Sequence, residues 1–159
     1  MNTELLLGLL FTMLPITELR VGLPIVIDYV SKNNLSVLPY FLLVILCNIL
    51  VIFFIFGFMN FFHKYFLKFK WYNNFFSNKI SKLQDKSVKL QTKINNWGYF
   101  GLVVFVAIPL PGTGAWTGSL LAWLLKLDQK KSIFSISLGV FIAGLIILIP
   151  SLGIFGLIY

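Results

Sequence analysis

Long apolar blocks alternate with short polar breaks along this chain, and two of the blocks could each cross a bilayer. Val37–Phe58 is almost entirely aliphatic or aromatic, with Asn48 as its only strongly polar residue. Ile133–Ile158 is the second block, and glycines and Pro150 are its only soft points. Each block exceeds the roughly 20 apolar residues that a spanning helix needs. The pattern therefore predicts two transmembrane helices.

Two further apolar regions are interrupted. Leu5–Leu14 stops at Pro15, and Val21–Val30 resumes after a short polar stretch. Tyr99–Ile108 and Ala115–Leu125 are likewise separated by a segment rich in proline and glycine. A piece of about ten residues forms a helix of roughly 15 Å, which is half the hydrocarbon thickness. Because proline lacks a backbone donor and glycine leaves helical geometry easily, we expect two pairs of half-helices.

The membrane limits where such breaks can lie. Irregular backbone at membrane depth is tolerated only when it is buried in protein or lines a wet cavity, so the two breaks are expected to face each other. The alternative is that each region forms one kinked spanning helix. Eight lysines lie between Lys64 and Lys93, and three more lie between Lys126 and Lys131. If Tyr99–Leu125 enters and leaves the membrane on one side, both lysine-rich loops are cytoplasmic, as the positive-inside rule favours.

The predicted fold is an all-α integral membrane protein. It contains an inverted repeat of two re-entrant helical hairpins, each followed by a transmembrane helix. We expect a single membrane domain over residues 1–159, with a first repeat (1–58), a basic cytoplasmic linker (59–97) and a second repeat (98–159). Inverted repeats in transporters place the substrate site near the membrane midplane.

The linker carries its own helical pattern. Apolar residues recur at helical spacing, and lysines follow the same rhythm one residue earlier. This pattern predicts an amphipathic helix on the anionic head groups of the inner leaflet. A short coiled coil between protomers is the competing interpretation. The apolar residues are Ile80, Leu83, Leu90, Ile94 and Trp97, and the lysines are Lys79, Lys82, Lys86, Lys89 and Lys93.

Composition supports the membrane interpretation. Of the 159 residues, 58% are hydrophobic and only 11% are charged, with a mean hydropathy of +0.91. Soluble domains carry roughly 25% charge, and the long apolar blocks rule out a soluble helical bundle with striped helices. The net charge of +8 is concentrated in the two loops, and we expect no nucleic-acid partner. Met1–Leu14 has no basic start and no cleavage site after it, so we expect it to belong to the mature fold.

The chain lacks the side chains that most enzyme and metal sites require. Cys47 is the only cysteine and His63 the only histidine. No nucleophile elbow, P-loop or dinucleotide fingerprint occurs. We therefore expect no enzyme activity, no cofactor and no metal site.

Glu18 and Arg20 are the most informative polar residues. They follow Pro15 between two apolar half-helices, which would place them near mid-bilayer. A charge there costs about 2.5 kcal/mol or more, and such residues usually face a cavity and carry function. Glu18 could carry a proton, while the planar guanidinium of Arg20 suits a phosphate. The alternative is a structural contact between the two that pins the hairpin.

The second break suits an anion by different means. Its prolines and glycines expose backbone amides at the start of a half-helix, where the helix dipole is positive. The alternative is an ordinary helix cap. Glu18 is the predicted proton-coupling residue. The predicted substrate-binding residues are Arg20, Thr17, Pro15, Gly22, Pro109, Pro111, Gly112, Thr113, Gly114 and Thr117.

These residues carry a family resemblance. Pro15–Pro24 and Ile108–Gly118 resemble the two signatures of the small multidrug export protein family, and the likeness covers nearly the whole chain. That family is similar in plan to the larger DedA/VTT group, which is associated with facing re-entrant loops and lipid movement. By this resemblance, Glu18 and Arg20 replace the group's membrane-embedded charges, and Pro109–Gly114 forms the second re-entrant turn. The chain is shorter than that group, and its second break has no arginine.

The resemblance implies a multi-pass protein of a prokaryotic plasma membrane, with membrane lipids as partners. The expected function is a proton-linked translocator (flippase) of an anionic amphiphile such as a lipid phosphate. One alternative is an exporter of small hydrophobic compounds, with Glu18 as the counter-charge to a cation. Another is a non-transporting scaffold that docks partners through its basic helix. Because so small a chain cannot easily surround an amphiphile, a homodimer is also considered.

Overall fold

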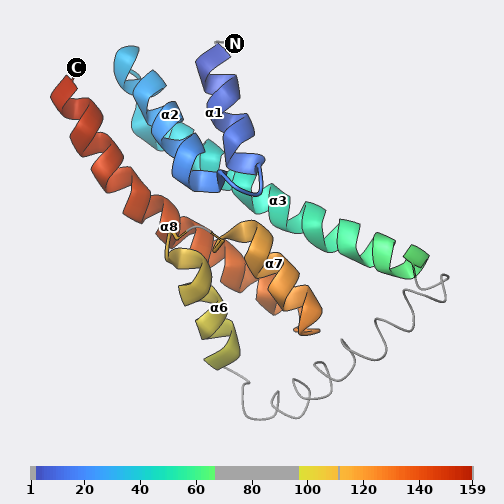
Figure 1. Cartoon of the computed structure of the whole chain (residues 1–159). Coiled ribbons are helices and arrows are strands. Elements are labelled where there is room, and N and C mark those ends of the chain that lie inside the picture. Colours follow the sequence, from blue (N-terminus) through green and yellow to red (C-terminus); the bar gives the residue numbers. More distant parts are fainter. Residues whose placement is uncertain (1–2, 67–96, 111, 159) are drawn as a thin grey trace.

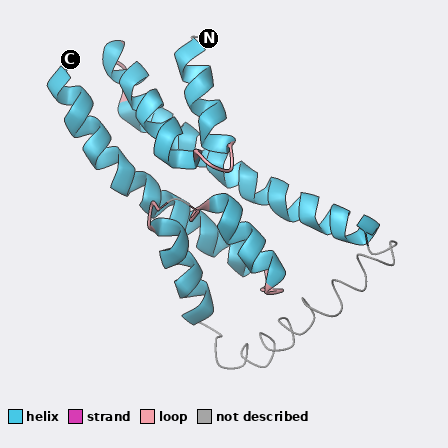
Figure 2. Cartoon of the chain, viewed as in Figure 1, coloured by secondary structure: helices cyan, strands magenta, loops and turns pink. Residues whose placement is uncertain are grey.

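The computed structural model describes residues 3–66, 97–110 and 112–158. The helices are α1 (Thr3–Met13), α2 (Glu18–Lys32), α3 (Val37–Phe66), α6 (Trp97–Ala107), α7 (Ala115–Leu124) and α8 (Gln129–Ile158) (Figure 1). These described segments contain no strand (Figure 2). The all-α fold class is therefore confirmed.

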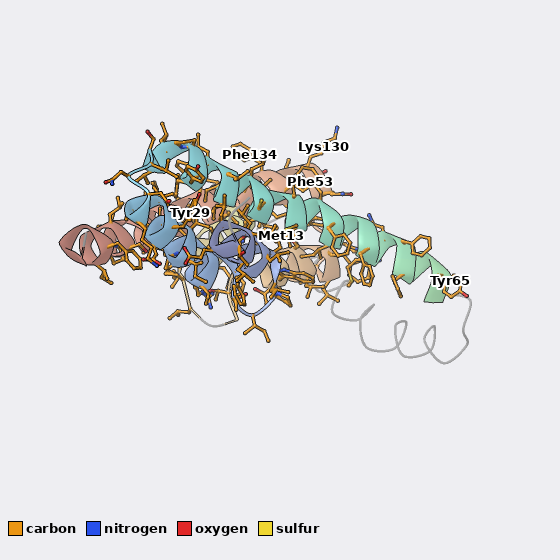
Figure 3. All side chains as sticks on the ribbon, turned by 90° about the horizontal axis from the view of Figure 1, so that it is seen from above. Met13, Tyr29, Phe53, Tyr65, Lys130 and Phe134 are labelled. Atoms are coloured by element: carbon orange, nitrogen blue, oxygen red, sulfur yellow. The ribbon has the colours of Figure 1, made fainter. Side chains whose placement is uncertain are left out.

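Two of these helices are candidate membrane spans. Val37–Phe62 within α3 has a mean hydropathy of 3.0, and Gln129–Phe155 within α8 has a mean hydropathy of 2.6. Both are long and apolar enough to cross a bilayer, as the sequence pattern predicts. Their outward side chains are largely apolar. Phe53 is 52% exposed and Phe134 is 72% exposed (Figure 3), which fits a surface that contacts lipid.

The chain is interrupted at the two positions that proline and glycine predict. The first break (residues 14–17) separates α1 from α2, and the second break (residues 108–114) separates α6 from α7. Figure 1 shows the chain reversing direction at each break, so that each region is a pair of helices and not one kinked helix. The two breaks meet near the centre of the molecule.

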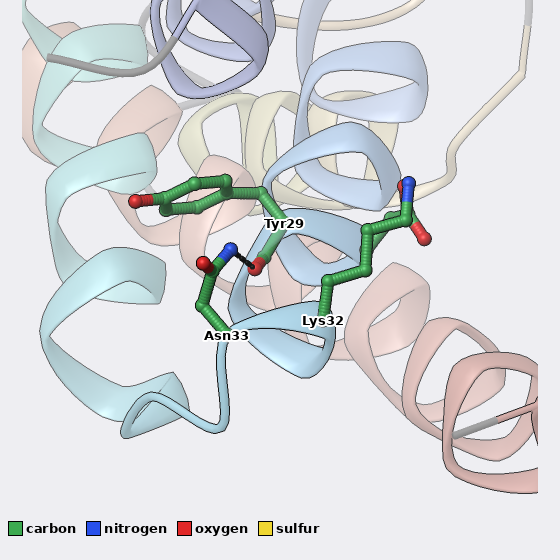
Figure 4. A network of polar contacts seen from close by, with 4 residues as sticks. Tyr29, Lys32 and Asn33 are labelled. Atoms are coloured by element: carbon green, nitrogen blue, oxygen red, sulfur yellow. Dashed lines mark hydrogen bonds and ion pairs between the residues drawn. The ribbon is translucent and has the colours of Figure 1, made fainter.

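Helices α1 and α2 pack closely because glycines face each other between them. A Cβ added at Gly8 would lie 2.6 Å from a methyl group of Val26, and a Cβ at Gly22 would collide with the Thr12 side chain. Small residues allow this approach between membrane helices. At the far end of α2, the Asn33 side-chain amide donates to the Tyr29 carbonyl at 2.8 Å and satisfies a terminal acceptor (Figure 4).

The second hairpin packs differently. Helix α6 lies mainly against α8, whereas α7 is held against α3 and α8. The contact of α6 with α8 is close at Gly139, where an added Cβ would lie 2.8 Å from the Val103 carbonyl oxygen. The main core fills the space between α2, α3 and α8, with Leu23, Ile52 and Ile136 fully buried. This core holds the two breaks against each other.

Helix α3 is longer than the apolar block that predicts it. Helix α3 continues to Phe66, beyond the predicted end at Phe58, because Phe61, Phe62 and Tyr65 extend the apolar run. The first residues of the predicted linker (59–97) thus continue this helix, and the division into repeats and linker stays a prediction. The predicted amphipathic helix, with Lys79, Lys82, Lys86, Lys89 and Lys93, lies outside the described residues.

Candidate functional site

Glu18 connects the two breaks. It is the first residue of α2 and has a left-handed backbone conformation (φ 44°), which turns the chain from the first break into the helix. Its side chain is only 7% exposed. One carboxylate oxygen, Oε1, accepts a hydrogen bond of 3.1 Å from the backbone N–H of Trp116, in the first turn of α7. The carboxylate thus lies at the positive end of that helix, where an anion is stabilised.

Gly114 provides the space that this carboxylate occupies. Its φ of 146° is one that residues with a side chain rarely adopt, and a Cβ added there would collide with the Glu18 carboxylate. Gly114 is itself the N-cap of α7. A glycine is therefore required here for both backbone conformation and volume.

Arg20 makes the second connection between the breaks. Its Nη2 donates to the backbone carbonyl of Thr113 and, at 3.1 Å, to the Thr113 hydroxyl oxygen. That hydroxyl also accepts from the Leu110 N–H at 3.2 Å and lies 2.6 Å from the Ile108 carbonyl oxygen, to which it can donate. Thr113 thus organises the second break, and Arg20 attaches to it through charge-assisted hydrogen bonds.

Trp116 makes a third connection. Its indole Nε1 donates at 3.0 Å to the carbonyl of Met13, which is one of the acceptors that the last turn of α1 leaves without a helical partner. Trp123, one heptad further along α7, donates to the Asn60 side chain at 2.9 Å. The two tryptophans therefore fasten α7 to α1 and to α3.

The start of α7, predicted to suit an anion, faces a side chain of the protein itself. There the chain's own Glu18 carboxylate already accepts a backbone N–H. Glu18 and Arg20 each bond across to the second break, so they do more than hold their own hairpin together. The sequence places both charges beside a break, but their reach across roughly a hundred residues cannot be derived from local spacing.

A small cavity lies between the breaks and the two long helices. Its volume is about 10 Å³, which is room for about one water molecule. Glu18, Arg20 and Asn48 are polar residues in its wall, and most of the rest is apolar, including Val106 and Val140. The wall therefore combines one acid, one base and one amide in an otherwise hydrophobic setting.

Asn48 is the functional candidate that sequence reasoning passed over. It lies in the middle of α3 and is 1% exposed. Its Nδ2 donates to the Thr12 carbonyl at 2.8 Å, while its Oδ1 has no hydrogen-bond partner among the described residues. The sequence does carry a signal for this residue: Asn48 is the only strongly polar residue of a predicted span. Buried polar groups in membrane helices are costly, so such a residue usually has a function.

The other predicted site residues divide into two groups. Pro109, Thr113 and Gly114 line the cavity with Glu18 and Arg20. Five do not line it. Thr17 donates to the Phe11 carbonyl at 2.6 Å, and Thr117 lies near the Gly114 carbonyl. Gly22 packs against Thr12, and Pro15 and Gly112 are exposed. Pro111 lies outside the described residues.

The described part of the chain holds no group of three or more His, Cys, Asp or Glu side chains that could bind a metal ion. The polar side chains that line the cavity are those of Glu18, Arg20, Asn48 and Thr113.

Comparison with known families gives a match over residues 18–146, to the family described as "Putative small multi-drug export protein". The matched segment begins at Glu18 and includes both charges that follow the first break and the whole second break. Comparisons with curated proteins and with solved structures gave no match.

Proposed function

Because the chain belongs to this family of small multidrug export proteins, we propose that it is a membrane transporter that exports small hydrophobic cations in exchange for protons. Glu18 is the group at which the exchange takes place. The observation that carries the proposal is a buried carboxylate in a largely apolar cavity, where the two breaks meet. In this proposal the site binds and releases a substrate without changing it chemically.

The exchange follows from competition for one negative charge. An ionised Glu18 attracts a cation, and the apolar wall accepts its hydrocarbon part. Protonation removes the attraction, and the remaining positive charge of Arg20 then repels the cation. A proton and a cation therefore exclude each other at Glu18. Cation affinity should rise with pH and fall as the carboxyl group is protonated.

The site must open for a substrate to enter. A cavity of about 10 Å³ holds only about one water molecule. The connections between the breaks are a few hydrogen bonds from Glu18, Arg20 and Trp116. When a cation takes the place of the Trp116 N–H at the Glu18 carboxylate, one of these connections is lost. Substrate binding thus favours separation of the breaks, as alternating access requires.

The membrane arrangement is part of the proposal. Each hairpin helix in the first half of the chain is much shorter than α3, and the hairpins reverse at the molecular centre, which supports two re-entrant hairpins in an inverted repeat. The lysine-rich linker is then cytoplasmic, in the plasma membrane of a prokaryote, with its lysines on anionic lipid head groups. A homodimer would enclose a larger substrate path.

A lipid phosphate is the second candidate substrate. One observation favours it: with Glu18 protonated, the guanidinium of Arg20 and the first amides of α7 form a group of donors suited to a phosphate. A lipid phosphate would move in the same direction as the proton, whereas the cation moves in the opposite direction.

Transport in liposomes distinguishes these candidates. The purified chain is reconstituted with a pH gradient, and movement of ethidium is followed beside transbilayer movement of a labelled polyprenyl phosphate. We expect ethidium movement that requires the gradient and disappears in Glu18→Gln, but persists in Glu4→Gln, a matched control at an exposed acid of α1. Lipid movement alone would support the second candidate. If neither probe moves faster than in protein-free liposomes, the proposal is wrong.

A further inference from the structure

We propose that Asn48 and Glu18 together form a site for nitrogen groups that carry hydrogens, so that protonated amines bind in preference to quaternary ammonium ions. The inference rests on the proposed function for its cationic substrate, and it assigns a specificity-determining role to Asn48.

The orientation of the Asn48 amide is fixed by α1. Only the amide nitrogen can donate, and it does so to the Thr12 carbonyl at 2.8 Å. Helix α1 contributes no residue to the cavity wall, whereas Asn48 does. The nitrogen therefore points toward α1, and the oxygen is the amide atom left for the cavity.

This oxygen is a buried acceptor that needs a donor. An unpaired polar group in such a place costs about 1–3 kcal/mol. The Arg20 Nη2 is engaged by Thr113, and the Trp116 N–H is engaged by Glu18. Asn48 Oδ1 has no partner among the described residues. No donor of the described residues reaches this oxygen, so a ligand that donates a hydrogen bond fits this part of the wall.

The charge and the apolar wall define the ligand further. The Glu18 carboxylate has several lone pairs and a negative charge, so it favours a cationic donor. The cavity volume of about 10 Å³ suits a group the size of a water molecule, such as the nitrogen of a protonated amine. Leu19, Ala143 and Ile147 offer an apolar surface for the carbon part once the breaks separate. A quaternary nitrogen keeps the charge but has no hydrogen to donate to Asn48.

A matched pair of ligands isolates this hydrogen bond. Benzyldimethylamine is protonated at neutral pH and carries one N–H, whereas benzyltrimethylammonium has the same ring and charge with a methyl group in its place. Binding of each to the full chain in lipid nanodiscs is measured by calorimetry at pH 7. We expect the amine to bind roughly 10-fold tighter or more, which is the value of a hydrogen bond to a charged group.

Variants then locate the effect. Asn48→Leu should reduce the preference by weakening amine binding alone, because the N–H then has only Glu18 as its acceptor, while Asn48→Asp, which keeps an oxygen, should retain it. Ser119→Ala is the control, because Ser119 also has a buried oxygen without a partner among the described residues but is not in the cavity wall. We expect it to keep the full preference.

Equal binding of the two ligands by the wild-type chain, or no binding of either, would overturn the inference even if the variants do not fold. A preference that is undiminished in Asn48→Leu would also overturn it. If this inference fails while Glu18-dependent, proton-linked ethidium movement persists, the proposed function still stands. If the preference is found but no exchange occurs, the proposed function fails and the binding site remains.

Discussion

The two breaks solve the same structural problem with different chemistry. The first break is followed at once by two charged side chains, Glu18 and Arg20, whereas the second break contains no charged residue. The second break offers backbone groups instead: the Trp116 N–H to the acid and the Thr113 carbonyl to the base. Each half therefore lacks what the other provides, and the site exists only where they meet.

The two hairpins also differ in how they are held. Helices α1 and α2 are packed directly on each other through Gly8 and Gly22. Helices α6 and α7 make most of their contacts with α3 and α8. The hairpin that carries Glu18 and Arg20 is thus packed closely on itself, whereas the helices of the second hairpin pack mainly on other helices. If one hairpin moves during transport, this difference in packing favours movement of the second hairpin.

Replacing the glycine at the meeting point should have the largest effect. In Gly114→Ala, the added methyl group would displace the Glu18 carboxylate, and the backbone strain alone costs about 1–3 kcal/mol. We expect export to fall at least 10-fold in the liposome assay. Gly101→Ala in α6, where nothing lies within 4 Å of the new Cβ, should export normally. Similar activity in both variants would show that the Glu18 position is not needed.

Removing the base should separate binding from turnover. In Arg20→Gln, the charge-assisted bonds to Thr113 are lost, and with them about 1.5–3 kcal/mol of stability. Cation binding should strengthen, because the repelling charge is gone, while the export rate falls. Calorimetry and liposome transport measure the two quantities separately, and Lys32→Gln, at an exposed end of α2, is the control. Weaker cation binding in Arg20→Gln would contradict the release role of Arg20.

At Thr113 in the second break, loss of the side-chain hydroxyl should lower stability more than loss of the methyl group. Thr113→Val removes the oxygen that bonds Arg20 and Leu110, which costs about 1 kcal/mol, whereas Thr113→Ser keeps it. We expect a lower midpoint of thermal unfolding for the valine variant than for the serine variant. The reverse order would mean that packing, and not the hydroxyl, holds this break.

The smallest expected effect is at the indole connection. Trp116→Phe keeps an aromatic ring, though a smaller one, and the backbone N–H to Glu18 but loses the bond to the Met13 carbonyl. Net stabilisation by such a bond is about 0.5–1.5 kcal/mol, so thermal stability should fall slightly and proton coupling should persist. Loss of coupling in this variant would contradict the account, because the indole bond to Met13 would then be required for exchange at the carboxylate.

Element positions were predictable because proline and glycine mark the breaks. The half-helix predicted over Tyr99–Ile108 is α6 at Trp97–Ala107, and the one predicted over Ala115–Leu125 is α7 at Ala115–Leu124. The start of α8 at Gln129 was missed by four residues. There the Asp128 carboxylate accepts from the Lys131 N–H at 2.9 Å, so a recognisable cap precedes the apolar run.

The site was only partly predictable. Glu18 and Arg20 were found because charges are rare in apolar segments, and Gly114 because it lies in a break. The bond of Asn48 to the Thr12 carbonyl and the occupation of the α7 N-terminus by Glu18 are contacts between distant segments, which spacing does not encode. The amphipathic linker helix and the likeness in plan to the DedA/VTT group stay predictions.

Proton release on cation binding tests the central claim most directly. Ethidium is added to the purified chain in lipid nanodiscs in a weakly buffered solution, and the pH change is recorded beside the Glu18→Gln and Glu4→Gln variants. The account predicts release of up to about one proton per bound cation near the pH at which Glu18 titrates, none in Glu18→Gln, and an unchanged value in Glu4→Gln. Cation binding to the wild-type chain with no proton release at any pH, or equal release in Glu18→Gln, would contradict exchange at this carboxylate.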